Sequence, residues 1–141
     1  MTTVGIFDTN VLILLARLPD VSELPEEAVI TTVTLAELSV GPLVAADETD
    51  RSRRQAHLQA AESDFEPIPF DEAAARAFGG VAASLRGSGR KPAARSLDAM
   101  IAATAVSRGL PLYTCNPTDF ADIEGLEVVA VSPPDDIHPG P

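Results

Sequence analysis

The chain has 141 residues, of which 45% are hydrophobic, with one cysteine and a net charge of −11. This length suits one domain that buries roughly 70% of the surface exposed by its unfolded chain, so the core needs no disulfide. The longest apolar run, residues 11–16, is far short of the roughly 20 residues that span a bilayer, and no secretory signal is present. We therefore expect a cytoplasmic protein without a membrane partner.

The first half of the chain alternates predicted strands and helices. Residues Val4–Phe7 form an apolar run that predicts a buried strand, and a helix is expected over residues 9–18. A second strand is expected over residues 28–31, followed by a helix from Leu35 that Gly41-Pro42 interrupts. Residues 48–63 are polar and arginine-rich, with apolar residues at helical spacing, which predicts an exposed helix.

The second half continues the same alternation. Two prolines in residues 66–70 indicate an edge strand, because proline donates no ladder hydrogen bond. Asp71 is the expected N-cap of the next helix, and Gly109 is the expected C-terminal stop of the last one. The remaining expected segments are a helix over 72–85, a flexible basic loop over 86–92, a helix over 97–108, and strands over 112–114 and 126–131.

Strands and helices that alternate along a chain favour an α/β fold, with a parallel sheet covered by helices on both faces. We expect a single domain over residues 1–131. Residues 132–141 contain four prolines and are predicted to form a disordered C-terminal tail. Ligands of parallel sheets bind beyond the carboxyl ends of the strands, so candidate functional residues should gather at that edge.

Four acids lie at such positions: Asp8, Glu37, Asp98 and Asp119. Taken singly, each has a structural explanation. Asp8 could cap the helix that begins at residue 9, and Thr34 with Glu37 fits a capping box. Ser96 could cap the helix in whose first turn Asp98 lies, favourably placed against the helix dipole, and Asn116-Pro117 precedes Asp119 in the order preferred at a helix start.

Their joint occurrence points to more than capping, because the expected topology brings all four acids to neighbouring ends of one sheet. Unpaired carboxylates at short range raise one another's pKa and destabilise the fold. A hard divalent cation with oxygen ligands removes this conflict. We therefore interpret Asp8, Glu37, Asp98 and Asp119 as one site for divalent cations.

Other kinds of site are less well supported. His57 and His138 have no partner at zinc-binding spacing. Cys115 has no nearby histidine in the sequence, so we interpret it as a buried thiol. No glycine-rich phosphate loop follows a predicted strand. Asp8 could be the nucleophile of an aspartate-based phosphatase, but the usual second acid two residues later is Asn10 here. A catalytically silent protein-binding module is the other alternative.

Basic residues are concentrated in one short segment of this acidic chain. Arg86, Arg90, Lys91 and Arg95 fall within ten residues, just before Asp98 in the sequence. A local basic cluster gives an anionic polymer a foothold that the net charge would otherwise deny.

Four segments resemble the PIN-domain ribonucleases, and in particular the VapC toxins of toxin–antitoxin pairs. The resemblance covers the chain up to about Val131 and rests on residues 7–12 (FDTNVL), 34–38 (TLAEL), 97–105 (LDAMIAATA) and 112–120 (LYTCNPTDF). It implies a three-layer α/β/α sandwich with a mostly parallel sheet of four to five strands.

The resemblance also implies an activity and partners. It implies Mg²⁺ or Mn²⁺ held by Asp8, Glu37, Asp98 and the Asn116–Asp119 region, and endonucleolytic cleavage of RNA. Asp119 is the preferred fourth ligand and Asn116 an orienting residue, but either could bind the metal. The protein is then expected to be a homodimer, or part of a larger assembly, inhibited by a cognate antitoxin. Within this hypothesis, Arg86, Arg90, Lys91 and Arg95 would guide the RNA backbone.

Overall fold

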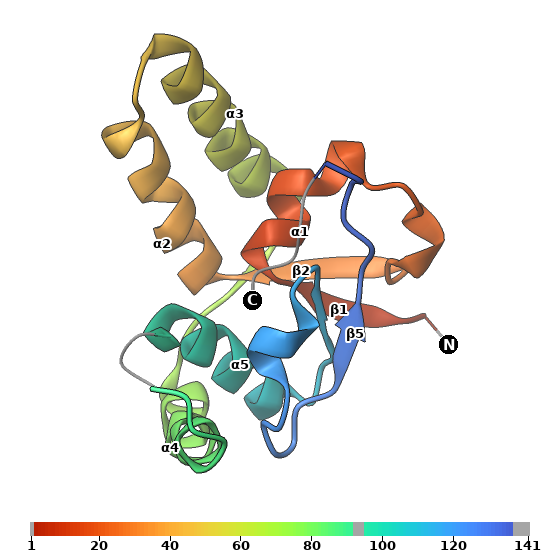
Figure 1. Ribbon diagram of the computed structural model, residues 1–141, viewed down its shortest axis with the longest axis vertical. Coiled ribbons are helices and arrows are strands. Elements are labelled where there is room, and N and C mark those ends of the chain that lie inside the picture. Colours follow the sequence, from red (N-terminus) through yellow and green to blue (C-terminus); the bar gives the residue numbers. More distant parts are fainter. Residues whose placement is uncertain (1, 92–94, 137–141) are drawn as a thin grey trace.

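A parallel five-stranded sheet forms the middle layer of the computed structural model, which describes residues 2–91 and 95–136 (Figure 1). The strand order is β3-β2-β1-β4-β5, and every neighbouring pair is parallel. The strands are β1 (Val4–Phe7), β2 (Glu27–Thr31), β3 (Pro67–Ile68), β4 (Leu112–Thr114) and β5 (Val128–Ala130). The proline-containing strand β3 lies at an edge of the sheet, which confirms the expectation from the sequence.

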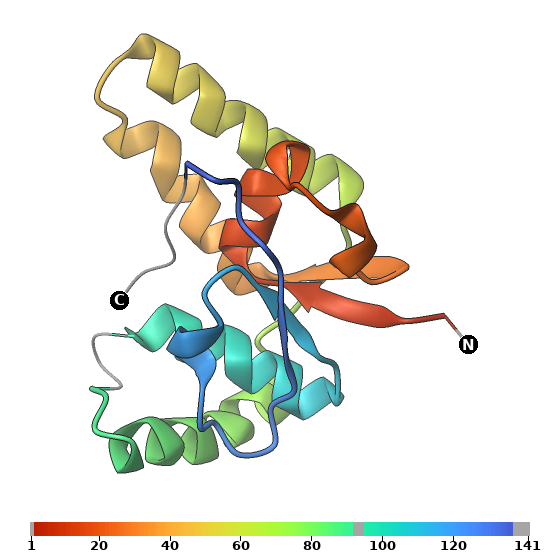
Figure 2. The ribbon, with the colours of Figure 1, turned by 45° about the vertical axis from the view of Figure 1, so that its right-hand side comes forward.

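Helices cover both faces of the sheet, and the two views in Figures 1 and 2 agree on their arrangement. One layer contains α1 (Thr9–Leu14), α2 (Thr32–Val40) and α3 (Glu48–Asp64), and the other contains α4 (Glu72–Gly87) and α5 (Ser96–Arg108). Short 3₁₀ turns complete the fold: η1 (Leu15–Arg17), η2 (Val21–Glu23), η3 (Gly41–Val44) and η5 (Pro117–Phe120). The predicted three-layer α/β/α architecture is thus confirmed.

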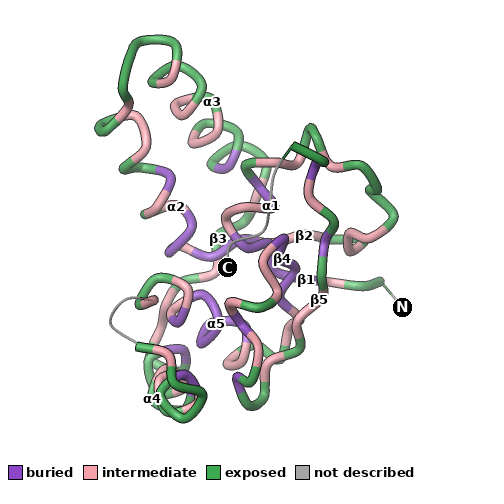
Figure 3. Tube along the Cα trace, in the orientation of Figure 1, coloured by how far each residue is buried: buried purple, intermediate pink, exposed green. Residues whose placement is uncertain are grey.

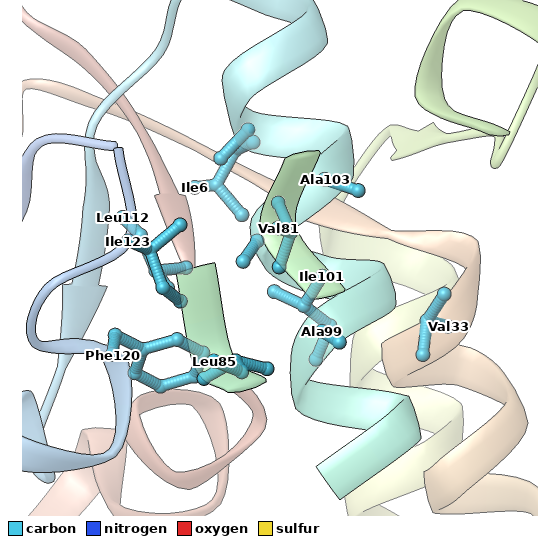
Figure 4. Packing of buried hydrophobic residues seen from close by; sticks show 12 residues of the cluster. Ile6, Val33, Val81, Leu85, Ala99, Ile101, Ala103, Leu112, Phe120 and Ile123 are labelled. Carbon is cyan, nitrogen blue, oxygen red and sulfur yellow. The ribbon is translucent and has the colours of Figure 1, made fainter. Parts of the chain in front are cut away.

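Successive residues of the central strands pack into opposite layers, as the period of two in a β-strand requires. Ile6 and Leu112 join the cluster beneath α4 and α5, together with Val81 and Phe120 (Figure 4). Phe7 and Tyr113, the next residues of β1 and β4, join the other cluster, beneath α1 and α3. Both faces of the two central strands are therefore buried, and the buried trace runs through the middle of the molecule (Figure 3).

Several boundaries differ from the sequence prediction for identifiable reasons. The helix after β1 ends as an α-helix at Leu14 and continues as the 3₁₀ turn η1. Helix α2 begins at Thr32 rather than Leu35, because the Thr31 side chain caps it by accepting a hydrogen bond from the Thr34 N–H at 3.2 Å. Asp71 caps α4 as expected, accepting from the Ala74 N–H at 3.0 Å.

The segment after β5 returns along the N-terminal part of the chain. The backbone N–H and the hydroxyl of Ser132 each donate to the Glu23 carboxylate at 3.0 Å. Asp136 accepts two hydrogen bonds from Arg17, at 2.6 and 2.7 Å. These contacts involve residues 132–136 of the expected tail, and residues 137–141 lie outside the described part of the chain.

Within the described ranges, none of the helices combines the length and the hydrophobicity that crossing a membrane requires.

The close approach of β1 and β4 leaves no room for a side chain at Gly5. A Cβ atom there would lie 2.2 Å from Cε1 of the buried Tyr113 ring. We expect Gly5→Ala to lower the free energy of unfolding by at least about 2 kcal/mol, because the ring or a strand must shift. Gly79→Ala is the matched control: Gly79 is exposed in α4, with open space around it, and the change should stabilise by about 1 kcal/mol. Chemical denaturation of both variants measures the two effects, and a tolerated Gly5→Ala would contradict the packing.

Candidate metal centre

The four predicted acids come from separate segments that meet at the carboxyl edge of the sheet. Asp8 directly follows β1, Glu37 lies in α2 after β2, Asp98 lies in the first turn of α5, and Asp119 lies in η5 after β4. Their charges act on one another: Asp8 faces the fields of Asp98 and Glu37, and Asp98 faces that of Asp119. Residues separated by more than 100 positions in the sequence thus share one acidic region.

Asp8 is the most deeply buried of these acids, with 5% of its surface exposed. Its Oδ1 accepts from the Thr9 N–H and its Oδ2 accepts from the Thr114 hydroxyl, both at 2.8 Å. Burial raises the pKa of Asp8 to about 7; the hydrogen bonds oppose the rise, and the charges of Asp98 and Glu37 add to it. Asp8 is therefore both the expected helix cap and a carboxyl group with an unusually weak acidity.

Glu37 is oriented by hydroxyl groups rather than by the start of its own helix. The Thr9 hydroxyl donates to Glu37 Oε1 at 2.9 Å and lies 2.9 Å from the Thr34 hydroxyl. Because Thr9 has a single hydroxyl proton, Thr34 is the donor in the second contact. Burial raises the pKa of Glu37, Thr9 opposes this, and Asp98 adds to it. The capping-box prediction was wrong, since the N-cap is Thr31 and Glu37 binds across to α1.

Asp98 and Asp119 share a positively charged neighbour. Arg95 Nη1 lies 2.9 Å from Asp119 Oδ1 and 4.0 Å from Asp98 Oδ2. Burial raises the pKa of Asp98, the charge of Asp119 adds to this, and Arg95 partly offsets it. The expected cap at Ser96 was wrong: Arg95 occupies the N-cap position of α5 and makes no side-chain capping bond.

Thr114 connects the acidic region to the loop after β4. Its hydroxyl donates to Asp8 and accepts from the Asn116 N–H at 3.0 Å, with the Asn10 amide at 3.5 Å. Asn10 Oδ1 in turn accepts from the Cys115 N–H at 3.2 Å. Thr9 and Thr114 were not predicted from the sequence as supporting residues. Each lies at the boundary of a strand or helix. The distant residues that they contact depend on how the strands and helices are arranged in the fold.

The prediction that Cys115 is a buried thiol is confirmed, because the cysteine is free and only 4% of the residue is exposed. Burial raises the pKa of this thiol, and the charges of Asp8 and Glu23 raise it further. A thiol of raised pKa is a poor nucleophile at neutral pH, which fits a packing role.

The donor set suits a hard divalent cation, but the carboxylates are not gathered around a common point. In residues 2–91 and 95–136, no three histidine, cysteine, aspartate or glutamate side chains are close enough to hold an ion together. The fit rests on donor chemistry and charge: the acids are oxygen donors, and three of them have raised pKa values from burial and mutual repulsion. Ligation of one ion by three or more of these acids would therefore require their carboxylates to move closer together.

The predicted basic cluster divides into residues with different roles. Arg90 donates three hydrogen bonds, at 2.6 to 3.1 Å, to backbone carbonyls in and just after η5, and so fixes the loop that contains Asp119. Arg95 lies among the acids, whereas Arg86 and Lys91 are exposed. The expected loop of residues 86–92 starts inside α4, and residue 92 lies outside the described part.

The raised pKa of Asp8 should make the metal-free protein more stable at mildly acidic pH. The pKa of Asp8 is about 7 in the fold against an ordinary value of 3.8, so between these values the folded state binds the proton more tightly than the unfolded chain. The free energy of unfolding should fall by up to roughly 4 kcal/mol as the pH rises from about 4 to 7. Denaturation with a chelator present, in wild type and Asp8→Asn, tests this. The variant should lack most of the fall, and identical profiles would contradict the assignment.

The chain is similar to proteins of a known family. The model of the PIN domain family matches residues 6–126. Ribonuclease VapC5 of Mycobacterium tuberculosis (strain ATCC 25618 / H37Rv) is 40% identical over 129 residues, which cover 90% of this chain and 93% of the relative. Ribonuclease VapC8 of Mycobacterium tuberculosis (strain CDC 1551 / Oshkosh) is 35% identical over 102 residues, covering 72% and 90%.

A solved structure shows the same fold. The crystal structure of VapBC-5 from Mycobacterium tuberculosis, a member of the VapBC family of toxin–antitoxin systems, matches with a TM-score of 0.80 and 37% identity. The match covers 92% of this chain and 99% of the other. The family match contains all four acids. The chain therefore belongs to the PIN-domain family and, within it, to the VapC ribonucleases.

Proposed function

We propose that this protein is the toxin of a toxin–antitoxin pair and cleaves RNA internally as a metal-dependent endoribonuclease. The observation that carries the proposal is the group of buried, mutually repelling acids at the carboxyl edge of the sheet. The ribonuclease relatives and the VapBC structure support it. We propose that the enzyme acts on RNA in the cytoplasm.

PIN-domain ribonucleases depend on a metal ion in general. For this chain we propose Mg²⁺ or Mn²⁺, with Asp8, Glu37, Asp98 and Asp119 as ligands. Bound Mg²⁺ supplies a Lewis acid for the scissile phosphate and lowers the pKa of water. Asp119 is preferred to Asn116 as the fourth ligand because its carboxylate already faces Asp98.

The chain's own hydroxyls and acids have distinct tasks in this proposal. Thr114 and Thr9 hold the carboxylates of Asp8 and Glu37 in fixed orientations through hydrogen bonds of 2.8 and 2.9 Å. Asp98 and Asp119 are more accessible, with 33% and 18% of their side chains exposed. One of these two is the candidate to accept a proton from the attacking water.

The RNA backbone is proposed to approach along the exposed basic residues, Arg86 and Lys91, and Arg95 in the site. Arg90 has a supporting role, because its donors are occupied by the carbonyls beside Asp119. Phosphate contacts of this kind make binding weaken with salt, so replacing Arg86 and Lys91 together by alanine should flatten the salt dependence of RNA binding.

An antitoxin is the second proposed partner. Two cavities of about 480 and 330 Å³ lie between α1–η1 and α3 and share Ile13 and His57 among their lining residues. The larger one also reaches Thr9 and Glu37 of the acidic region. The smaller cavity is lined mostly by apolar side chains, which suits the apolar face of a helix from the antitoxin, and the larger one adds Arg17, Arg53 and Arg54. Such a segment would cover the acids and so inhibit the enzyme.

We also propose that the protein forms a homodimer, alone or within a larger toxin–antitoxin assembly. Several large apolar side chains outside the core are exposed: Val40, Leu43, Val44 and Leu97. Sedimentation equilibrium of the purified chain tests the dimer, and a mass equal to one chain at all concentrations would contradict it.

The two alternatives fit the structure less well. A phosphatase of the aspartate type needs an acid two residues after Asp8, but the Asn10 amide is engaged with Thr114 and the Cys115 backbone. A silent binding module has no need for four coupled acids, of which three have raised pKa values.

Removing one acid should abolish cleavage without unfolding the protein. We expect Asp8→Asn and Asp98→Asn to lower Mg²⁺-dependent RNA cleavage at least about 100-fold, with metal-free folds that are as stable as wild type or more so. Glu62→Gln, an exposed acid of α3, is the control and should cleave normally. Sequencing of RNA ends after expression of wild type and Asp8→Asn identifies the substrate. Full cleavage by both acid variants would refute the proposed ligands.

A charged side chain in the two cavities should prevent inhibition by the antitoxin without removing a catalytic acid. Ile13 is 40% exposed and lines both cavities, so Ile13→Asp should abolish neutralisation by the co-expressed antitoxin. Val21→Asp, which is 68% exposed and outside both cavities, should leave neutralisation intact. Growth of cells that express toxin and antitoxin together measures the difference, and equal behaviour of the two variants would count against this docking site.

A further inference from the structure

Arg95 is a positive charge inside the acidic region. Its guanidinium lies 2.9 Å from Asp119 Oδ1 and 4.0 Å from Asp98 Oδ2, and 33% of its side chain is exposed. The arginine thus takes the position of a counter-ion for the two acids contributed by α5 and η5. The other two acids, Asp8 and Glu37, are relieved by hydroxyl donors instead.

The position of Arg95 in its helix is unfavourable in itself. It is the N-cap of α5 and makes no side-chain capping bond, so its charge lies at the positive end of the helix dipole. A cation is disfavoured there, and Asp98 and Asp119 are the groups that hold it in place. Among the described residues, Asp98 and Asp119 are the acids with which Arg95 forms ion pairs, so a second cation that neutralises both would release the guanidinium.

We propose that Arg95 is an internal counter-cation that a divalent metal must displace, and that the released guanidinium then binds a phosphate of the RNA. The inference rests on the proposed metal-dependent function and adds a residue that couples metal binding to substrate binding. Arg95 competes with the metal for Asp119 and Asp98 when no metal is present. Once released, its planar donor group remains beside the metal site, where it can bind a phosphate with two hydrogen bonds.

This role predicts opposite changes in two properties of one variant. Without the competing guanidinium, Arg95→Gln should bind Mn²⁺ about fivefold more tightly, the effect expected of a partly exposed ion pair. The same variant should have a kcat/KM for RNA cleavage at saturating Mg²⁺ about tenfold lower, since the phosphate contact is lost. A residue that merely supported the fold would weaken both properties.

The test is a titration of Mn²⁺ into the metal-free full-length protein, followed by calorimetry, for wild type, Arg95→Gln and Arg86→Gln. Arg86→Gln removes the same charge from an exposed position in the last turn of α4, so it controls for the overall field and should change metal affinity less than about twofold. Thermal unfolding of the metal-free variants checks that they are folded.

Several results would overturn the proposal. Unchanged or weaker Mn²⁺ binding by Arg95→Gln would rule out displacement, and undiminished cleavage by this variant would rule out the phosphate contact. In both cases the wild type would still bind Mn²⁺ and cleave RNA, so the proposed function would stand. A wild type that binds no divalent cation would instead remove the proposed function and this inference together.

Discussion

Repulsion among carboxylates in a poorly hydrated position is the constraint on which the rest of this structure depends. Asp8 is almost inaccessible to solvent, and it faces the charges of Asp98 and Glu37. The fold reduces this cost by three means: hydroxyl donors, a raised pKa that favours the protonated acid, and the guanidinium of Arg95. A site that is costly without a cation is one in which cation binding also stabilises the fold.

The sheet is what brings these groups into one region. Strand β1 pairs with β2 on one side and β4 on the other, so the residues that follow all three strands lie at the same edge. Thr114, at the end of β4, donates to Asp8, which follows the neighbouring strand. A one-residue change of register would exchange Phe7 and Ile6 between the two layers of the core and move Asp8 away from this partner.

The sequence predicted the architecture because its signals are local and periodic. The apolar runs of β1 and β4, the two prolines of β3 and the cap at Asp71 each determine an element without reference to distant residues. It also predicted which acids share a region, since strand ends in a parallel sheet meet at one edge. The capping box at Thr34 failed because Thr31 competes for the same helix start, and sequence alone does not rank two threonines that lie three residues apart.

The details of the site depend on contacts between distant segments, which no local pattern encodes. Thr9 binds Glu37 and Arg90 binds the carbonyls of η5 only after the layers have assembled. Arg90 and Arg95 look equivalent in the sequence, yet one supports a loop and the other neutralises the acids. The separation of the carboxylates likewise follows from side-chain positions, which the spacing of the acids in the sequence does not reveal.

The segment that returns from β5 has a practical consequence for handling the protein. Asp136 holds Arg17, and Arg17 lines the larger cavity between α1 and α3. A tag that pulls residues 132–136 away from Arg17 would therefore disturb the wall of that cavity. Residues 2–3 lead into β1 at the end of the strand opposite Asp8 (Figure 1), so a tag placed there suits measurements of complex formation better.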